Sequence, residues 1–384
     1  MGPLQGYRII EIAGIGPGPF AAMLLADMGA EVIRVERCES GMFDFSQTEL
    51  DFLNRGKRCI AVNLKSEQGV NIVKDLLMRA DGLIEGFRPG VMERFGLGPD
   101  DCLAINSKLI YGRMTGWGQT GPMAQTAGHD INYISLAGAL HPIGRSGDKP
   151  VIPLNLVGDF GGGGQMLAFG MVCALLEAQK SGEGQVVDAA MVDGAAVLMT
   201  SLFAAAQTGF WSEERGTNML DSGAHFYEVY ETQDGKYMAV GAIEPQFYAS
   251  LLEKLGLNND PELPEQFDAQ AWPALKQKLE SVFKQHPRAY WEKLFQGCDA
   301  CVTPVLSMSE VAAHPHHKAR ESFVHSESGV WQPRSAPRYS RTDSPRPEPA
   351  VAPGADTMRI LQELGYSESQ CEQLLSDEVV AQER

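Results

Sequence analysis

The sequence predicts an α/β protein in which a parallel sheet is covered by helices, followed by a smaller α+β domain. Three observations lead to this prediction: strand-like and helix-like segments alternate in the first half, the pattern changes after about residue 226, and the chain of 384 residues exceeds one ordinary domain. With 44% hydrophobic residues, the chain can also bury a substantial core.

In the first half of the chain, segments with the hydrophobic periodicity of a strand alternate with segments that have the periodicity of a helix. The predicted strands are residues 7–12, 31–35, 60–64, 82–85 and 109–111, and the predicted helices are residues 20–28 and 68–78. Parallel strands joined by helices place ligand sites at the carboxyl ends of the strands. We therefore expect the functional residues to follow these strands.

The turn at residues 14–19 (Gly-Ile-Gly-Pro-Gly-Pro) lies where a dinucleotide fold holds its phosphate loop. The match is weak because the third glycine is displaced and two prolines remove backbone donors. A tight strand-to-helix turn, with proline entering the helix, explains it better than an NAD site.

A second glycine-rich segment, residues 155–164, precedes a helical pattern and contains Asp159. Its glycines would allow the backbone to approach a ligand and would leave amide hydrogens free at a helix start. Spacing alone favours Asp159 as a helix N-cap, and helix amides would lower its pKa.

The net charge of −17 argues against general affinity for nucleic acid or an anionic membrane. An anionic ligand would need a local basic cluster, which the sequence offers at residues 54–58 (Asn-Arg-Gly-Lys-Arg), with Arg37, Lys65, Arg88 and Arg94 nearby. Composition alone favours a solvated surface turn for residues 54–58.

The N-terminus has no secretory signature, no stretch approaches the ~20 apolar residues of a membrane span, and the C-terminus has no peroxisomal signal. Seven scattered cysteines agree with a reducing compartment. These features predict a cytoplasmic protein.

No metal site is predicted. The pair Cys298 and Cys301 lacks a second such pair, and the histidines around Pro315 lack carboxylate or cysteine partners at ligand spacing. His129 differs because it lies between two sheet-type units, where a structural and a catalytic role are equally compatible with the pattern.

The second half divides by composition. We expect a large domain over residues 1–200, a linker at 201–226, a small α+β domain at 227–330, and a proline-rich segment followed by one amphipathic helix and a charged tail at 331–384.

Seven separated segments resemble the α-methylacyl-CoA racemases of the class III (formyl-CoA transferase type) coenzyme A-transferase family. They are residues 14–18, 54–58, 86–90 (Gly-Phe-Arg-Pro-Gly), 113–122 (Arg-Met-Thr-Gly-Trp-Gly-Gln-Thr-Gly-Pro), 128–133 (Gly-His-Asp-Ile-Asn-Tyr), 155–160 (Asn-Leu-Val-Gly-Asp-Phe) and 241–245 (Gly-Ala-Ile-Glu-Pro). The resemblance extends from the first predicted strand to Trp331.

This resemblance implies a Rossmann-like large domain, a small domain, and a homodimer of two chains interlinked like rings, with residues 331–384 returning to complete the large domain. It also implies coenzyme A as part of an acyl-CoA substrate, with no separate cofactor. The implied coenzyme A contacts are Arg37 against adenine, then Val62, Asn63, Leu64, Lys65, Gly86, Phe87, Arg88, Arg94, Gly128, Asp130, Ile131, Asn132 and Tyr133.

The implied reaction is racemisation of 2-methylacyl-CoA, which needs a base on each face of the carbon beside the thioester. The family pattern puts His129 on the S face, Asp159 on the R face, and Glu244 as a hydrogen-bond partner of His129. The backbone around Gly128, His129 and Asp130 would bind the thioester oxygen.

Two other functions remain as alternatives. A coenzyme A-transferase would use Asp159 as a nucleophile and needs no opposing base, so His129 and Glu244 favour the racemase. A non-catalytic acyl-CoA-binding protein would need neither proton-transfer group. The acyl chain beyond the 2-methyl group is left open by the sequence.

Overall fold

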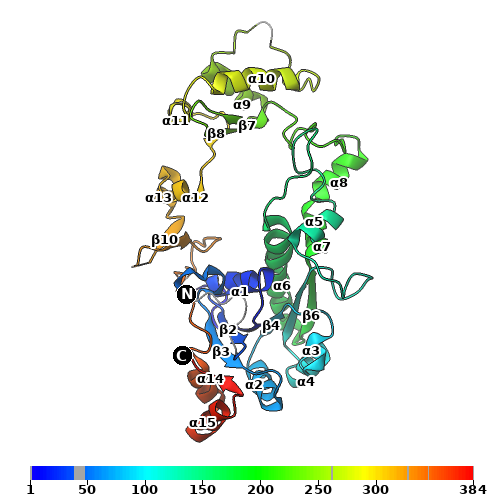
Figure 1. Cartoon of the computed structure of the whole chain (residues 1–384), viewed down its shortest axis with the longest axis vertical. Helices are drawn as coiled ribbons and strands as arrows, with labels where there is room; N and C mark the ends of the chain where they lie inside the picture. Colours follow the sequence, from blue (N-terminus) through cyan, green and yellow to red (C-terminus); the bar gives the residue numbers. More distant parts are fainter. Residues whose placement is uncertain (1, 39–47, 261–262, 327, 345, 384) are drawn as a thin grey trace. The chain divides into compact units, whose positions relative to one another are not determined.

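The computed structural model describes residues 2–38, 48–260, 263–326, 328–344 and 346–383. The chain forms two compact units. The first comprises Met1–Ala137, Leu154–Leu198 and Ala319–Arg384, and the second comprises Gly138–Pro153 and Met199–Lys318. Each unit is described separately below (Figure 1).

A seven-stranded sheet forms the centre of the first unit, with the order β12-β3-β2-β1-β4-β5-β6. The strands are β1 (Arg8–Ile12), β2 (Glu31–Glu36), β3 (Arg58–Val62), β4 (Gly82–Glu85), β5 (Ile110–Thr115), β6 (Gln185–Ala190) and β12 (Val380–Ala381). All pairs are parallel except that of β12 with β3. Without β12, this is the 3-2-1-4-5-6 order of a doubly wound fold, whose strand order reverses between β1 and β4.

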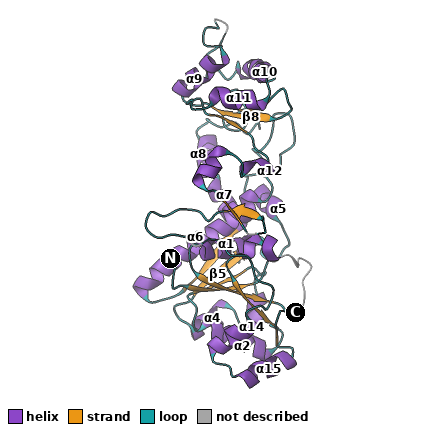
Figure 2. Ribbon diagram, turned by 90° about the vertical axis from the view of Figure 1, so that its left-hand side faces the viewer, coloured by secondary structure: helices purple, strands orange, loops and turns teal. Residues whose placement is uncertain are grey.

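Helices cover both faces of this sheet (Figure 2). One face packs against α1 (Pro17–Asp27) and α6 (Met166–Ser181), with Leu25, Leu167 and Met171 in the core. The other face packs against α2 (Glu67–Leu77), α4 (Pro99–Ile105), α14 (Thr357–Leu364) and α15 (Glu368–Ser376). The prediction of an α/β fold with a large parallel sheet is confirmed.

Shorter elements complete the first unit. They are η1 (Thr48–Leu50), η2 (Phe52–Asn54), α3 (Val91–Arg94), α5 (Asp130–Leu136), the π-helix η3 (Leu156–Gln165), α7 (Met191–Leu198), β10 (Phe323–His325) and β11 (Trp331–Pro333).

The C-terminal tail is more ordered than predicted. We expected a charged tail after the helix at residues 357–364, but α15 follows, and Val380 and Ala381 then pair with Val62 and Ala61. A strand of two residues has no recognisable period, and its pairing depends on the position of β3. The proline-rich segment before it belongs to the same unit, although Pro345 lies outside the described residues.

One helical stretch, Leu156–Ser181, joins η3 to α6 and is long and apolar enough to span a membrane by length and composition. We did not expect such a stretch from the sequence. Within it, Leu167 and Met171 are completely buried against the sheet. A core helix passes the same length and composition test, so packing in the first unit explains the buried part of the stretch, while Phe169 and Leu176 are exposed.

The second unit is built around a three-stranded antiparallel sheet of β7 (Tyr227–Glu231), β8 (Tyr237–Gly241) and β9 (Val302–Pro304). The predicted turn at Asp234 and Gly235 joins β7 to β8, with Gly235 at a φ of 70°. The helices are α8 (Thr200–Gln207), α9 (Pro245–Leu255), α10 (Trp272–Phe283), α11 (Arg288–Phe295) and α12 (Met308–Val311). The helix α13 (Pro315–Arg320) begins in this unit, which ends at Lys318.

The observed boundaries differ from the predicted ones. Residues 138–153 belong to the second unit, and residues 201–226 are part of that unit rather than a linker. Arg215 explains this difference, because its side chain donates hydrogen bonds to the carbonyl oxygens of His141 and Asp148. Contacts between segments so far apart in sequence leave no compositional signal.

Candidate active site

Most of the predicted coenzyme A contacts lie at the carboxyl edge of the sheet. Arg37 follows β2, Asn63 to Lys65 follow β3, and Gly86 to Arg88 follow β4. Arg37, Lys65, Arg88 and Arg94 have exposed side chains. Val62 is different, because its side chain is buried in the core and its strand position is paired with Val380. The exposed basic groups are therefore available to an anionic ligand at this edge.

The basic motif at residues 54–58 is committed to the fold instead. Arg55 is buried and donates to Asp27 at 2.5 Å and to Gln332 at 2.9 Å, while Lys57 donates to Glu11 at 2.6 Å. Both interpretations made from the sequence, a solvated turn and an anion-binding cluster, are wrong for these two residues. Their positive charges are already neutralised inside the first unit.

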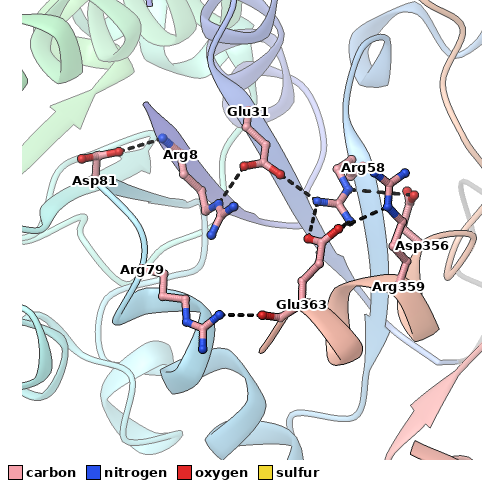
Figure 3. A network of polar contacts seen from close by, with 8 residues as sticks. All are labelled: Arg8, Glu31, Arg58, Arg79, Asp81, Asp356, Arg359 and Glu363. Atoms are coloured by element: carbon pink, nitrogen blue, oxygen red, sulfur yellow. Dashed lines mark hydrogen bonds and ion pairs between the residues drawn. The ribbon is translucent and has the colours of Figure 1, made fainter. Parts of the chain in front are cut away.

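Arg58 is also paired with carboxylates, in a network near the C-terminal helices (Figure 3). Its guanidinium lies 2.7 Å from Glu31 on β2 and 2.8 Å from Glu363 on α14. Arg79 donates to the backbone carbonyl oxygen of Glu363 at 2.6 Å. These contacts attach the returning C-terminal segment to the sheet.

The glycines of the second glycine-rich segment allow close helix packing. They lie in η3, which packs against α1 and α7. A Cβ on Gly162 would lie 2.5 Å from the backbone nitrogen of Ala195, and one on Gly164 would lie 2.6 Å from the carbonyl oxygen of Pro17. The glycines thus allow backbone to approach backbone, rather than the ligand approach we expected.

Asp159 is the fourth residue of this π-helix, so the N-cap interpretation is wrong. Its Oδ2 accepts a hydrogen bond from the side-chain amide of Asn155 at 3.2 Å. The same oxygen lies 3.5 Å from where a Cβ on Gly16 would be, which places it against the loop after β1. Doubly wound folds bind ligands at the carboxyl ends of the strands, at the point where the strand order reverses, and the loop after β1 lies there.

The protonation of Asp159 also differs from expectation. Burial raises the pKa of the Asp159 carboxyl, the hydrogen bond from Asn155 opposes this, the negative charge of Asp130 raises it further, and His129 lowers it. The predicted lowering of the pKa by helix amides is therefore wrong, because burial and the charge of Asp130 raise it. A raised pKa is favourable for a carboxyl group that must both take up and deliver a proton.

Asp130 connects the segment of His129 to the segment of Asp159. His129 is exposed and immediately precedes α5, and its backbone N–H donates to Asn132 Oδ1 at 3.0 Å. The next residue, Asp130, is buried, and its Oδ2 accepts hydrogen bonds from the backbone N–H groups of Gly158 at 2.7 Å and Asp159 at 2.8 Å. The fold therefore brings the predicted bases, 30 residues apart in sequence, to adjoining segments.

Tyr133 supports the loop that carries His129. Its ring is buried, packs edge-on against Trp117 at 4.8 Å between centroids, and its hydroxyl donates to the carbonyl oxygen of Gly128. Gly128 has to lack a side chain here, because a Cβ would lie 2.7 Å from the Tyr133 ring. The predicted coenzyme A contacts Asp130 and Tyr133 thus have buried side chains, whereas Ile131 and Asn132 are exposed.

Tyr133 also links the two parts of the site electrostatically. Burial raises the pKa of the Tyr133 phenol, the charge of Asp159 raises it too, and Arg88 lowers it. Arg88 at the end of β4 and Asp159 in η3 therefore act on one side chain.

Glu85 was not identified from the sequence. It is completely buried at the end of β4, accepts from the backbone N–H of Phe87 at 2.7 Å, and accepts from Arg113 at 3.0 Å. Burial raises its pKa to about 7. Its hydrogen bonds fix the loop of Gly86, Phe87 and Arg88. The sequence signal that could have identified Glu85 was a carboxylate at the end of an otherwise apolar strand.

Glu244 lies in the second unit, where it is exposed and immediately precedes α9. The predicted hydrogen bond to His129 stays a prediction. Among the described residues, no group of three or more His, Cys, Asp or Glu side chains is arranged to hold a metal ion.

Comparisons with known proteins give a consistent picture. A model of CoA-transferase family III matches residues 4–357. The chain is 48% identical to an alpha-methylacyl-CoA racemase from Mus musculus, over 99% of this chain and 98% of the relative. It is 32% identical to a succinyl-CoA:glutarate CoA-transferase from Mus musculus, over 100% of this chain and 91% of the relative. A crystal structure of a CAIB/BAIF family protein from Brucella suis is 26% identical with a TM-score of 0.81, and the match covers 94% of this chain and 99% of that one.

Proposed function

The chain belongs to CoA-transferase family III, and on this basis we propose that it is an isomerase that interconverts the R and S forms of 2-methylacyl-CoA thioesters. The observation that supports this most directly is the pair of hydrogen bonds from Gly158 and Asp159 to Asp130, because they hold two proton-transfer groups on adjoining segments. The 48% identity to a racemase over nearly the whole chain gives independent support.

In the proposed reaction, ionised Asp159 removes the α-proton of the R substrate. The C–H bond breaks, and its electron pair moves toward the thioester oxygen as an enolate. Protonated His129 then donates a proton to the opposite face while the carbonyl re-forms. The reverse reaction exchanges these roles, and Glu244 would favour the protonated form of His129 through a hydrogen bond.

The enolate oxygen needs hydrogen-bond donors near the bases. The backbone N–H groups of Asp130 and Ile131 are the first two of α5, so they have no partner within that helix. They directly follow His129. We assign the thioester oxygen to these N–H groups, which would stabilise negative charge as it develops.

The transferase alternative uses Asp159 as a nucleophile that forms an anhydride with the acyl group. Two observations favour the racemase. The identity to the racemase is 48%, compared with 32% to the transferase. In addition, His129 is exposed beside the segment of Asp159, and the transferase reaction has no need for a second base.

A direct assay tests the proposed activity. We expect the purified protein alone to convert a 2-methylacyl-CoA of single configuration at C2 into a mixture of the 2R and 2S forms, with solvent deuterium incorporated at the α-carbon. Chiral analysis and mass spectrometry measure both quantities. Transfer of the acyl group between acceptors, without deuterium incorporation, would favour the transferase instead.

The exposed basic edge is proposed to bind the coenzyme A phosphates, while Arg37 stacks on adenine. Arg88→Ala and Lys65→Ala are each expected to raise KM about 10–100-fold with little change in kcat, because a hydrogen bond to a charged group contributes ~1.5–3 kcal/mol. Steady-state kinetics with one acyl-CoA provide the measurement. Arg359→Ala is the matched control, since Arg359 is an exposed arginine on α14. An equal rise in KM for the control would refute a specific phosphate site.

Further proposals concern assembly, location and cofactors. We propose a homodimer of interlinked chains, which is supported by exposed apolar side chains such as Phe169 at 68% and Leu176 at 53% on α6. We also propose a cytoplasmic enzyme that needs no metal or redox cofactor. The net charge of −17 supports the absence of nucleic-acid and membrane partners.

A further inference from the structure

We propose that Asp130 is a positioning residue for the two-base reaction: its carboxylate holds the backbone of Asp159 against the start of the helix that His129 precedes. This inference rests on the proposed racemase function. It assigns to the Asp130 side chain a role separate from substrate contact, because that side chain is only 5% exposed.

The geometry gives Asp130 two bonds at the required place. A single oxygen, Oδ2, accepts from Gly158 N at 2.7 Å and from Asp159 N at 2.8 Å. These bonds fix the two consecutive backbone N–H groups of Gly158 and Asp159 rather than the Asp159 side chain, so the carboxylate of Asp159 remains free to exchange protons. Because Asp130 is adjacent to His129, these bonds tie the backbone at the start of α5 to the backbone of Asp159.

Gly158 is part of the same contact. A Cβ at this position would lie 2.6 Å from Asp130 Oδ2 and 2.9 Å from Asp130 Cγ. Any side chain on residue 158 would therefore push the carboxylate away from its two donors. The glycine and the aspartate form one interlocking pair, and a change in either should have the same consequence.

The second carboxylate oxygen strengthens the inference. Asp130 Oδ1 is buried and has no hydrogen-bond partner among the described residues. An unsatisfied buried oxygen destabilises a fold, so a residue chosen for stability alone would be expected to have both oxygens paired. The charge has a further effect, because it raises the pKa of Asp159.

Two single substitutions separate position from charge. Asp130→Ala removes the acceptor, so kcat should fall by ~10²-fold while KM changes little, as expected when a reacting group is displaced by about 1 Å. Deuterium exchange from the R substrate, which depends on Asp159, should fall more than exchange from the S substrate. Asp130→Asn keeps an oxygen acceptor, so its kcat should fall less than that of Asp130→Ala.

The pH profile of Asp130→Asn distinguishes this role from a purely structural one. Asp130, His129 and Tyr133 are the titratable groups that interact with Asp159 among the described residues. Removal of the Asp130 charge lowers the pKa of Asp159, so the acidic limb of kcat/KM for the R substrate, which requires ionised Asp159, should move to lower pH. A substitution that only loosened the fold would leave this limb in place.

A double-mutant cycle provides the decisive test. Gly158→Ala should reproduce the loss seen with Asp130→Ala, and the double variant should be little worse than either single variant, because Asp130→Ala removes the two nearest atoms that the new Cβ meets and leaves only Ile134 Cγ2 at 3.1 Å. Circular dichroism and native mass measurements on each variant check that it is folded, and Asp193→Asn on α7 is a matched carboxylate control.

The outcomes are distinguishable. If the parent protein exchanges deuterium but Asp130→Ala does so equally well, or loses exchange from both enantiomers in equal proportion, the positioning role is refuted. Additive losses in the double variant would also refute it. If the parent protein itself neither racemises nor exchanges, the proposed function fails, and the Asp130 inference fails with it.

Discussion

His129→Ala and Asp159→Asn are each expected to slow racemisation by ~10²–10⁴-fold, the usual effect of removing a general base. Each variant should nevertheless still exchange the α-proton of one enantiomer with solvent. His129→Ala retains Asp159 and should exchange deuterium into the R substrate, whereas Asp159→Asn retains His129 and should exchange deuterium into the S substrate. The measurement is deuterium uptake by each enantiopure thioester, followed by chiral analysis.

The comparison between the two variants carries more information than either rate alone. A loss of fold would reduce deuterium exchange from both enantiomers. Exchange of the R substrate by one variant and of the S substrate by the other is therefore specific to bases on opposite faces. Asp193→Asn, a substitution of an exposed aspartate on α7, should behave like the parent. If His129→Ala racemises at the parent rate, a two-base mechanism with His129 is wrong.

The stability of Asp159→Asn should change in the opposite direction from its activity. The pKa of the Asp159 carboxyl is higher in the folded protein than its ordinary value of 3.8. As the pH rises above this ordinary value, the ionisation of Asp159 therefore lowers the free energy of unfolding. A neutral amide avoids this cost. The variant should therefore unfold at the same or a higher temperature than the parent at neutral pH, so its inactivity cannot be attributed to unfolding.

The central strands of the sheet were predictable because they are buried on both faces. Ile9, Ile10 and Ile12 of β1 form a nearly continuous apolar run, and all three side chains are buried. Such signals are local, so sequence alone reveals them. The strand β12 was missed because its two residues are ordered by pairing with β3.

The candidate site was predictable in its residue types but less so in its physical chemistry. His129 and Asp159 were identified through family motifs, and the structure brings their segments together. The pKa of Asp159, however, depends on burial and on Asp130, which lies 29 positions away. Similarly, Arg55 has partners at Asp27 and Gln332, so sequence could not show that this basic motif is neutralised inside the fold.

The buried ion pair of Lys57 and Glu11 provides the second large expected effect. Their side chains are 1% and 0% exposed, and Lys57 Nζ donates to Glu11 at 2.6 Å, to the carbonyl oxygen of Pro19 at 3.0 Å and to Asn54 at 3.0 Å. Burial lowers the pKa of Lys57, and the charge of Glu11 opposes this. All three donors of the ammonium group are therefore used, one of them at the first turn of α1.

Lys57→Met should reduce the free energy of unfolding by ~3–5 kcal/mol, because it leaves Glu11 charged, buried and without its partner. Urea denaturation followed by circular dichroism measures this loss. The double variant Glu11→Leu/Lys57→Met should recover most of it, since replacing a buried ion pair with apolar residues is often neutral. Arg58→Met is the matched control. Arg58 pairs with partly exposed carboxylates, so its loss should cost only ~1 kcal/mol.

The double variant also tests how the fold supports the site. Pro19 lies in α1, and Gly16, immediately before that helix, lies against Asp159. Without the Lys57 hydrogen bond to Pro19, the start of α1 should hold Asp159 less firmly. The double variant should therefore be nearly as stable as the parent but have a lower kcat, with deuterium exchange from the R substrate reduced more than exchange from the S substrate. Equal stability losses in Lys57→Met and Arg58→Met would contradict the energetic role given to this pair, and full activity in the double variant would show that the α1 start is held by other contacts.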